Sequence, residues 1–153
     1  MNWFLENRRL SMLIRIVLGA VFLYSAWPKI ADPPGFAEMI WNYRILPGSF
    51  VNPLAILLPW LELFAGLALV SGVLRRGAAI LIGMLLLVFI AALATDLARG
   101  IAVDCGCFAV ASETRTIQEM FASMKLDLLR DSGLALLAAQ VLFARSAQHR
   151  QSI

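Results

Sequence analysis

Charged, metal-ligating and thiol-bearing residues are scarce in this chain of 153 residues. Only 15% of its residues are charged, against about 25% in soluble domains, and 61% are hydrophobic. This composition excludes an ordinary soluble domain and is typical of integral membrane proteins. The single histidine, His149, and the two cysteines fall short of the four ligands that a closed zinc site needs. No stripe of aromatic and basic residues accompanies the formal charge of +3, so we expect no binding of nucleic acid.

Long apolar runs fill most of the sequence instead. A membrane-spanning helix needs about 20 apolar residues, and the runs predict four such helices. Each run must be helical, because a segment isolated in lipid has to satisfy its own backbone hydrogen bonds. We therefore expect an all-α fold, in which residues 1–153 form a single membrane domain built as a four-helix bundle. The predicted spans cover residues 11–29, 53–73, 77–97 and 126–144.

Basic residues near the ends of the spans predict their orientation. Arg75 and Arg76 fill the very short turn between the second and third runs, and short loops carry this rule. We therefore place that turn and both chain termini in the cytoplasm, and the loop of residues 98–125 on the opposite side. The first run is interpreted as a retained span rather than a signal peptide, because Arg15 interrupts it and no small-x-small cleavage site follows.

An amphipathic segment lies in the first outer loop, residues 30–52. We expect a short interfacial helix on the membrane surface there, since its apolar residues fall near helical spacing. The alternative of a lid over the cysteine loop stays open. A break over Asp32-Pro33-Pro34-Gly35 precedes the segment, and Leu46-Pro47-Gly48 ends it. The apolar residues are Phe36, Met39, Ile40, Tyr43 and Ile45, with Trp41 beside them.

The two cysteines, Cys105 and Cys107, are separated only by Gly106. A disulfide needs Cα atoms about 4.4–6.8 Å apart, and two residues separated by one neighbour in an extended chain lie at or beyond that limit. The segment must bend, and glycine permits this bend. The resulting ring is expected to be strained and readily reduced, which suits electron transfer. We therefore predict a redox pair in which Cys105 and Cys107 are catalytic, with Asp104 beside them as a proton-handling group.

Other interpretations of the cysteine pair stay open. Two thiolates also suit a soft metal ion such as Cu(I) or Hg(II), so the chain is alternatively a metal-binding or transport protein. The pair is alternatively a structural disulfide or two inert thiols. A further alternative is a scaffold subunit that holds a partner at the membrane without using the cysteines.

Ionisable residues inside the spans need a reason, because each costs about 2.5–3.5 kcal/mol at the centre of a bilayer. Glu62 lies roughly 13 Å below the outer surface. Lys29, at the outer end of the first span, is a candidate partner, and a neutral Glu62 is the alternative, since desolvation disfavours the charged form. A proton or quinone role for Glu62, with Trp60 as a neighbouring contact for a quinone, also stays open.

A group of charged residues is expected around the cysteine loop at the outer face. Ion pairs that close this end of the bundle explain most of them. Residues that are also candidates for supporting the cysteines are Lys29, Glu62, Asp96 and Arg99, with Asp104 and Gly106 of the motif itself. The group comprises Lys29, Asp96, Arg99, Asp104, Asp127 and Asp131. Small residues are expected at close helix contacts. These are Gly66, Gly72, Ala91, Ala92, Gly133 and Ala138.

Several motifs resemble those of the MauE branch of the DoxX-like membrane proteins. The resemblance covers roughly residues 11–108 and rests most on Asp104-Cys105-Gly106-Cys107-Phe108 together with Leu58-Pro59-Trp60-Leu61-Glu62-Leu63. This chain has Ala109 where the family often has glycine. The other matching stretches are Gly19-Ala20-Val21-Phe22-Leu23, Trp27-Pro28-Lys29-Ile30, Asp32-Pro33, Phe36, Tyr43-Arg44-Ile45-Leu46-Pro47 and Gly66.

The resemblance implies a bacterial inner-membrane protein of four helices with a periplasmic cysteine loop. It also implies an extracytoplasmic thioredoxin-like partner and a link to the maturation of methylamine dehydrogenase, a periplasmic protein with many disulfides. With the residues above, it gives the hypothesis of a thiol–disulfide exchange protein. Such a protein relays electrons between that partner and the membrane, with a quinone as a candidate carrier. The oligomeric state and the direction of electron flow stay open.

Overall fold

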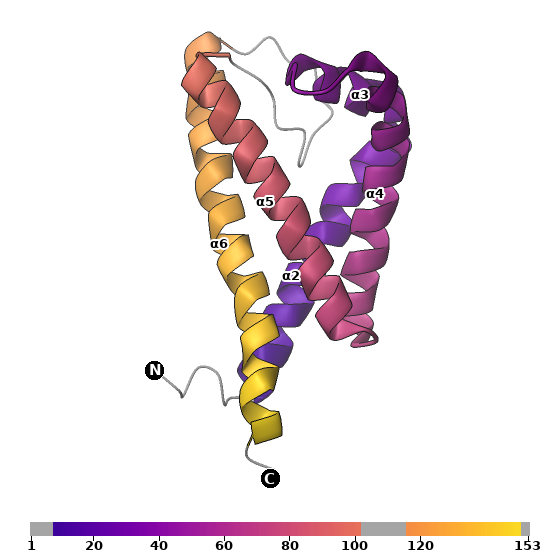
Figure 1. Cartoon of the computed structure of the whole chain (residues 1–153), viewed down its shortest axis with the longest axis vertical. Coiled ribbons are helices and arrows are strands. Elements are labelled where there is room, and N and C mark those ends of the chain that lie inside the picture. The colour runs from indigo at the N-terminus through magenta and orange to yellow at the C-terminus, as the bar shows by residue number, and fades with distance from the viewer. Residues whose placement is uncertain (1–7, 102–115, 151–153) are drawn as a thin grey trace.

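The computed structural model describes the backbone of residues 8–101 and 116–150 and the side chains of 9–101 and 116–143. Within these residues the fold is all-α, with no strand, as the composition predicts (Figure 1). The helices are α2 (Arg8–Ala31), α3 (Pro33–Asn42), α4 (Gly48–Ser71), α5 (Arg75–Arg99) and α6 (Ile117–Arg150).

The four long helices pack side by side (Figure 1). Helix α2 lies along α4, and α5 lies along α6, while α2 also contacts α6 and α4 contacts α5. The short helix α3 packs on α4 and α2 at one end, which we call the α3 end. The opposite end, which holds the α4–α5 turn, the start of α2 and the end of α6, is called the α4–α5 end.

Helices α2 and α5 enclose the predicted spans 11–29 and 77–97. Helix α4 begins at Gly48, five residues before the predicted start at residue 53, so that Pro53 lies inside it. The ends of α4 and α5 are set by Gly72 and Gly100, whose φ angles of 81° and 70° are in the left-handed region that glycine adopts without strain.

The predicted break before α3 is confined to Asp32. Its side chain accepts a hydrogen bond of 3.1 Å from the backbone N–H of Gly35 and caps the helix, and Pro33 is its first residue. Proline is tolerated there because the N–H it lacks has no partner within the helix. The predicted C-terminal end of this helix was also wrong, because α3 ends at Asn42 and the expected members Tyr43 and Ile45 follow it.

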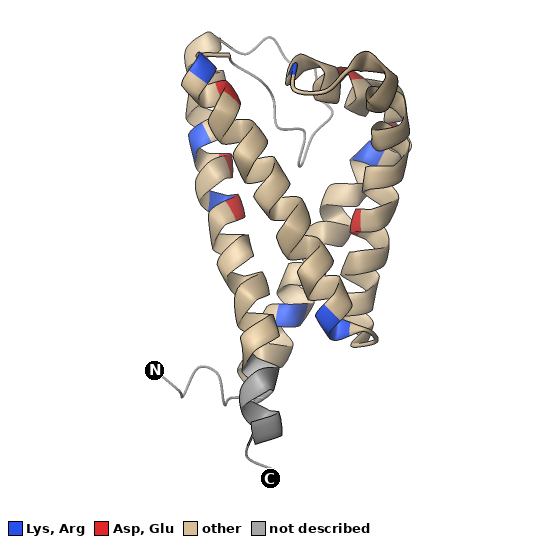
Figure 2. Cartoon of the chain, viewed as in Figure 1, with Lys and Arg blue, Asp and Glu red and all other residues tan. Residues whose placement is uncertain are grey.

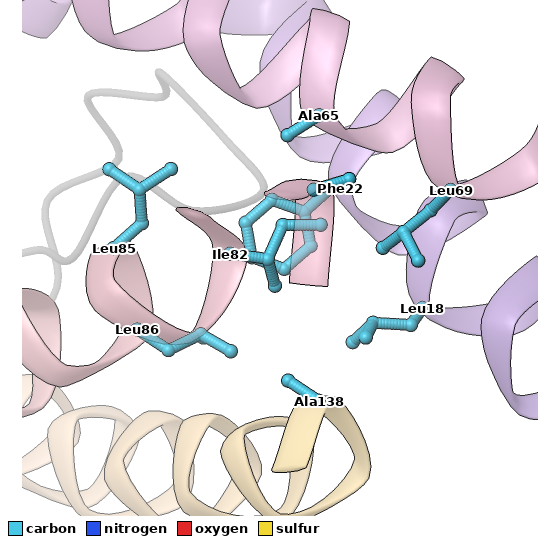
Figure 3. Close-up of a cluster of buried hydrophobic side chains, with 9 residues drawn as sticks. Leu18, Phe22, Ala65, Leu69, Ile82, Leu85, Leu86 and Ala138 are labelled. Carbon is cyan, nitrogen blue, oxygen red and sulfur yellow. The ribbon is translucent and has the colours of Figure 1, made fainter. Parts of the chain in front are cut away.

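The apolar core lies where α2, α4, α5 and α6 meet (Figure 3). Its labelled members point toward one another and are buried. They are Leu18 and Phe22 on α2, Ala65 and Leu69 on α4, Ile82, Leu85 and Leu86 on α5, and Ala138 on α6.

Helices α2 and α4 touch through their backbones at two glycines. A Cβ atom added to Gly19 would lie 2.8 Å from the carbonyl oxygen of Gly66, and one added to Gly66 would lie 2.9 Å from that of Gly19. The predicted close contact at Gly66 is therefore present, and Gly19 is its counterpart. The same prediction for Gly133 was wrong, because no atom lies within 4 Å of the position its Cβ would take.

Three of the described helices are long and apolar enough to cross a membrane, namely Arg9–Ala31, Gly48–Ser71 and Arg75–Arg99. Only 28–33% of their most apolar stretches is buried, and large side chains such as Trp27 and Phe64 face outward. Such surfaces suit lipid, so the chain is a membrane protein. Helix α6, which contains the fourth predicted span, is not among the three, and it carries Asp127, Arg130 and Asp131.

Candidate functional site

Lys29 of α2 and Glu62 of α4 form a buried ion pair between the helices. The Lys29 Nζ donates hydrogen bonds of 2.8 Å to Glu62 Oε1 and 2.7 Å to Oε2. Their side chains are only 1% and 2% exposed. The structure thus supplies the partner that a carboxylate at this depth needs, and Lys29, the candidate named from the sequence, is that partner.

The antiparallel packing of α2 and α4 explains how the two side chains meet. From the Gly19–Gly66 contact, Lys29 is ten residues and Glu62 four residues toward the α3 end, which leaves an axial offset of about 9 Å between their Cα atoms. Side chains on a helix lean toward its N-terminus. Because the helices run in opposite directions, Lys29 and Glu62 lean toward each other and close this offset.

Aromatic rings from two further helices enclose the ammonium group. The Lys29 Nζ lies 5.2 Å from the centre of the Phe36 ring on α3 and 5.3 Å from that of Phe89 on α5. Both distances are within the range of cation–π attraction. A buried ion pair is costly to desolvate, and these rings add an attraction that partly offsets the cost.

A second charged group on α6 faces the same interior. Arg130 pairs with Asp131 at 3.1 Å and with Asp127 at 3.0 Å, and the Asp131 side chain is 6% exposed. A cavity of about 30 Å³, with room for about two water molecules, separates this group from the ion pair. Ser25, Lys29, Glu62, Phe89, Arg130 and Asp131 are among the residues that line it.

The formal charges at the cavity balance. Lys29 and Arg130 supply two positive charges, and Glu62 and Asp131 supply two negative ones. Most side chains of the other lining residues are apolar, among them Phe22, Phe89 and Leu134. Asp127, which pairs with Arg130 but does not line the cavity, adds a third negative charge to the group. The arrangement is therefore a polar centre among apolar side chains, able to hold water or the polar end of a small molecule.

Comparison with known families agrees with this architecture and with the motifs. The model of one family, described as methylamine utilisation protein MauE, matches residues 7–144. The chain belongs to the MauE family. The resemblance based on the cysteine motif and the Pro59–Leu63 stretch is thereby confirmed, and it extends beyond residue 108 into α6.

Three curated MauE proteins are similar to this family member, and each bears the name "Methylamine utilization protein MauE". The protein of Methylophilus methylotrophus is 40% identical over 98 residues, which is 63% of this chain and 50% of that protein. The protein of Paracoccus denitrificans is 36% identical over 106 residues, which is 69% of this chain and 57% of that protein. The protein of Methylorubrum extorquens is 37% identical over 99 residues, which is 64% of this chain and 53% of that protein.

The chain therefore spans about half the length of the curated MauE relatives that it matches, between 50% and 57%. No solved structure matches it.

The other predicted site residues of this MauE protein are not joined to the ion pair. Asp96 is 0% exposed, and neither of its carboxyl oxygens has a hydrogen-bond partner among the described residues. Arg99, one turn further along α5, is exposed. Trp60 is 45% exposed and lies about 200° around α4 from Glu62, so the structure does not bring these two together. Asp104, Cys105, Gly106 and Cys107 lie outside the described residues.

Three members of the site were missed from the sequence. Phe36 was expected to face the membrane surface, but it is buried against Lys29. Ser25 is one turn before Lys29 on α2, and this spacing was the available signal for a shared face. Phe89 belongs to a long apolar run in which nothing distinguishes it from its neighbours.

Proposed function

We propose that this MauE protein is a membrane-embedded thiol–disulfide exchange protein. Cys105 and Cys107 cycle between a dithiol and a disulfide and exchange electrons with a thioredoxin-like protein outside the cytoplasm. The observation that carries the proposal is the Asp104-Cys105-Gly106-Cys107-Phe108 motif, since these are the only two cysteines of the chain. The described helices that flank the motif, α5 and α6, have their adjoining ends at the α3 end.

The exchange is a two-electron reaction. A thiolate of the pair attacks the disulfide of the partner to form a mixed disulfide and releases one thiolate of the partner. The second cysteine then attacks the mixed disulfide, which leaves the Cys105–Cys107 disulfide and a dithiol partner. Regeneration of the dithiol needs two electrons and two protons, and a membrane quinol that is oxidised to a quinone supplies both. The reverse direction balances in the same way.

The described residues support this chemistry by fixing how the helices pack together. The Lys29–Glu62 pair joins α2 to α4, and Phe36 brings α3 onto the same centre. The buried Asp96 lies in the last two turns of α5, on the approach to Cys105. We propose that Asp96, Arg99 and Asp104 adjust the charge around the thiols, since nearby charges shift the balance between thiol and thiolate.

We further propose that the chain is one domain of four membrane spans, with α6 as the fourth. Apolar side chains repeat along the exposed side of α6, namely Leu126, Leu129, Leu136 and Phe143. Its charged residues Arg130 and Asp131 line the cavity beside Lys29 and Glu62, and the Asp131 side chain is buried. Helix α3 then lies at the membrane surface, and its exposed Trp41 suits the interface.

The charge distribution supports an orientation with both termini in the cytoplasm. Figure 2 shows basic positions toward both ends of the described part, and the deciding ones are Arg75 and Arg76 at the start of α5, because they adjoin the very short α4–α5 turn and short loops carry the orientation rule. Basic residues mark the cytoplasmic side. The α3 end and the cysteine motif are then periplasmic, where disulfides persist.

The pathway we propose follows from the relatives. They are named for methylamine utilisation, so we propose that this chain acts in the bacterial inner membrane on periplasmic proteins that need disulfides, methylamine dehydrogenase among them.

A redox titration of the purified protein tests the exchange activity. A midpoint of the Cys105/Cys107 couple between about −120 and −270 mV, the range of known exchange catalysts, supports the proposal. A value below about −300 mV identifies a structural bond and contradicts it. The Cys105→Ser/Cys107→Ser variant contains no cysteine and is the blank. Tight Cu(I) binding by the dithiol without exchange toward thioredoxin would instead support a metal-handling function.

Labelling in whole cells tests the orientation. Because only Gly106 separates the two cysteines, a membrane-impermeant maleimide applied after mild reduction reports directly the side of the membrane on which the motif lies. We expect labelling in cells with a permeable outer membrane. Labelling that requires lysis of the inner membrane would place the motif in the cytoplasm and contradict the proposal.

A further inference from the structure

The α4–α5 end carries a cluster of arginines that the proposed exchange activity does not use. No Asp or Glu of the described residues accompanies them at this end (Figure 2). Arginines at the ends of spans set membrane orientation, but Arg15 and Arg75 are in addition held beside Gly72. The cluster comprises Arg9, Arg15, Arg75 and Arg76.

Arg15 is the inner member of the cluster. It lies about 10 Å along α2 from Arg8, and its Nε atom is buried without a hydrogen-bond partner among the described residues. The guanidinium rests against Gly72, where an added Cβ would lie 3.2 Å from one terminal nitrogen of Arg15 and 3.3 Å from the other. A side chain at Gly72 would therefore crowd the guanidinium.

Arg75 is anchored at the same residue. Its Nε donates a hydrogen bond of 3.0 Å to the carbonyl oxygen of Gly72. Two guanidinium groups therefore converge on Gly72, and like charges gathered at one residue repel each other. Neither group forms an ion pair within the described residues, so their mutual repulsion is not offset there.

The helix dipoles do not neutralise this charge. The C-terminus of α4 has a partial negative charge and the N-terminus of α5 a partial positive one, each of about half an elementary charge. Only the residues from Gly72 to Leu74 separate the two ends, so their effects nearly cancel. The two positive charges of Arg15 and Arg75 therefore stay uncompensated by the helix ends, and a bound anion would lower the electrostatic energy of the pair.

We propose that Arg15 and Arg75, converging on Gly72, form a binding site for a phosphate group, supplied by the headgroup of an anionic phospholipid. Guanidinium groups bind phosphate oxygens through paired N–H donors, and Arg15 makes no hydrogen bond to a described residue. The adjoining turn presents Val73 and Leu74, which are 62% and 78% exposed. Apolar side chains beside the arginines are suited to contact acyl chains, which favours a lipid over free phosphate.

Lipid binding by the purified full-length chain tests this site independently of any thiol chemistry. Native mass spectrometry and thermal unfolding are measured in micelles that contain phosphatidylglycerol or phosphatidylcholine. We expect tighter binding and a higher unfolding temperature with phosphatidylglycerol. Arg15→Gln should lower the phosphatidylglycerol affinity about fivefold, the usual contribution of one basic residue at a charged membrane surface. Arg75→Gln is the second variant, in case Arg15→Gln does not fold.

Arg44→Gln is the matched control, because Arg44 is an exposed arginine near the α3 end. It should leave the preference for phosphatidylglycerol unchanged. Equal binding of both lipids, or an equal loss in Arg44→Gln and Arg15→Gln, would overturn the proposal. Stabilisation by inorganic phosphate but not by phosphatidylglycerol would overturn the lipid as the source.

An internal counterion is the remaining alternative. Glu6 precedes the described residues. If its carboxylate neutralised Arg15, Glu6→Gln would lower the unfolding temperature in phosphatidylcholine as much as Arg15→Gln does, and the site would not exist. We expect Glu6→Gln to leave that temperature unchanged.

Discussion

The buried Lys29–Glu62 pair gives the sharpest test of the structure. Lys29→Met replaces the ammonium group with an apolar side chain of similar length and leaves the Glu62 carboxylate without a partner. Because the two side chains are 1% and 2% exposed, bulk solvent cannot replace the lost ammonium, and the cavity beside the pair has room for only about two water molecules. Removing one partner of a buried pair costs about 3–5 kcal/mol, and we expect a loss of this size.

The double variant Lys29→Met/Glu62→Met should behave differently from either single variant. Replacing both charges with apolar side chains of similar volume removes the desolvation penalty together with the attraction, so the stability should return to within about 1 kcal/mol of wild type. The coupling energy in the double-mutant cycle is then several kcal/mol, far above the roughly 0.2–1 kcal/mol of an exposed pair.

Thermal unfolding followed by tryptophan fluorescence in detergent measures all four proteins. For a chain of this size, about 2–4 °C of unfolding temperature corresponds to 1 kcal/mol, so each single variant should unfold about 6–20 °C lower. Lys125→Met, on the exposed side of α6, is the matched control and should shift by less than about 2 °C.

Two outcomes would refute this reasoning. A shift in Lys29→Met no larger than that in Lys125→Met would mean that the lysine is solvated. A double variant that loses the sum of the two single losses would mean that the residues do not interact. The stable double variant also separates structure from chemistry, because loss of thiol exchange in a folded double variant would assign the charges themselves a part in the reaction.

Three further variants test other features. Gly19→Ala places a Cβ 2.8 Å from the Gly66 carbonyl oxygen and should lower the stability measured by thermal unfolding by about 1–3 kcal/mol. Gly133→Ala, with open space around it, is the control and should not destabilise the protein. Equal effects of the two variants would contradict the backbone contact of α2 and α4. Asp96→Asn should keep or raise the unfolding temperature, since it removes a buried carboxyl without a described partner; a fall of several degrees would show that its partner lies outside the described residues. Leu136→Asp, at a position 73% exposed, should lower the yield of membrane-inserted protein if α6 spans the bilayer, and normal insertion would argue against a fourth span.

The sequence by itself determined the membrane character and the helical class of this protein. Uniformly apolar runs such as those within α2, α4 and α5 have one stable form in lipid, so composition and length are sufficient evidence. The motifs around Glu62 and Cys105 were sufficient to identify the MauE family, because each is a short contiguous stretch of sequence that can be recognised without knowledge of its tertiary contacts.

Only the tertiary structure decided which charged residues meet. Lys29 and Glu62 are 33 positions apart, and their contact depends on the register that the Gly19–Gly66 contact sets between antiparallel helices. The inward position of Phe36 likewise depends on how α3 folds back over α2 and α4. Periodicity gives the apolar face of a helix but not its neighbour, because that choice is made by packing between segments distant in the chain.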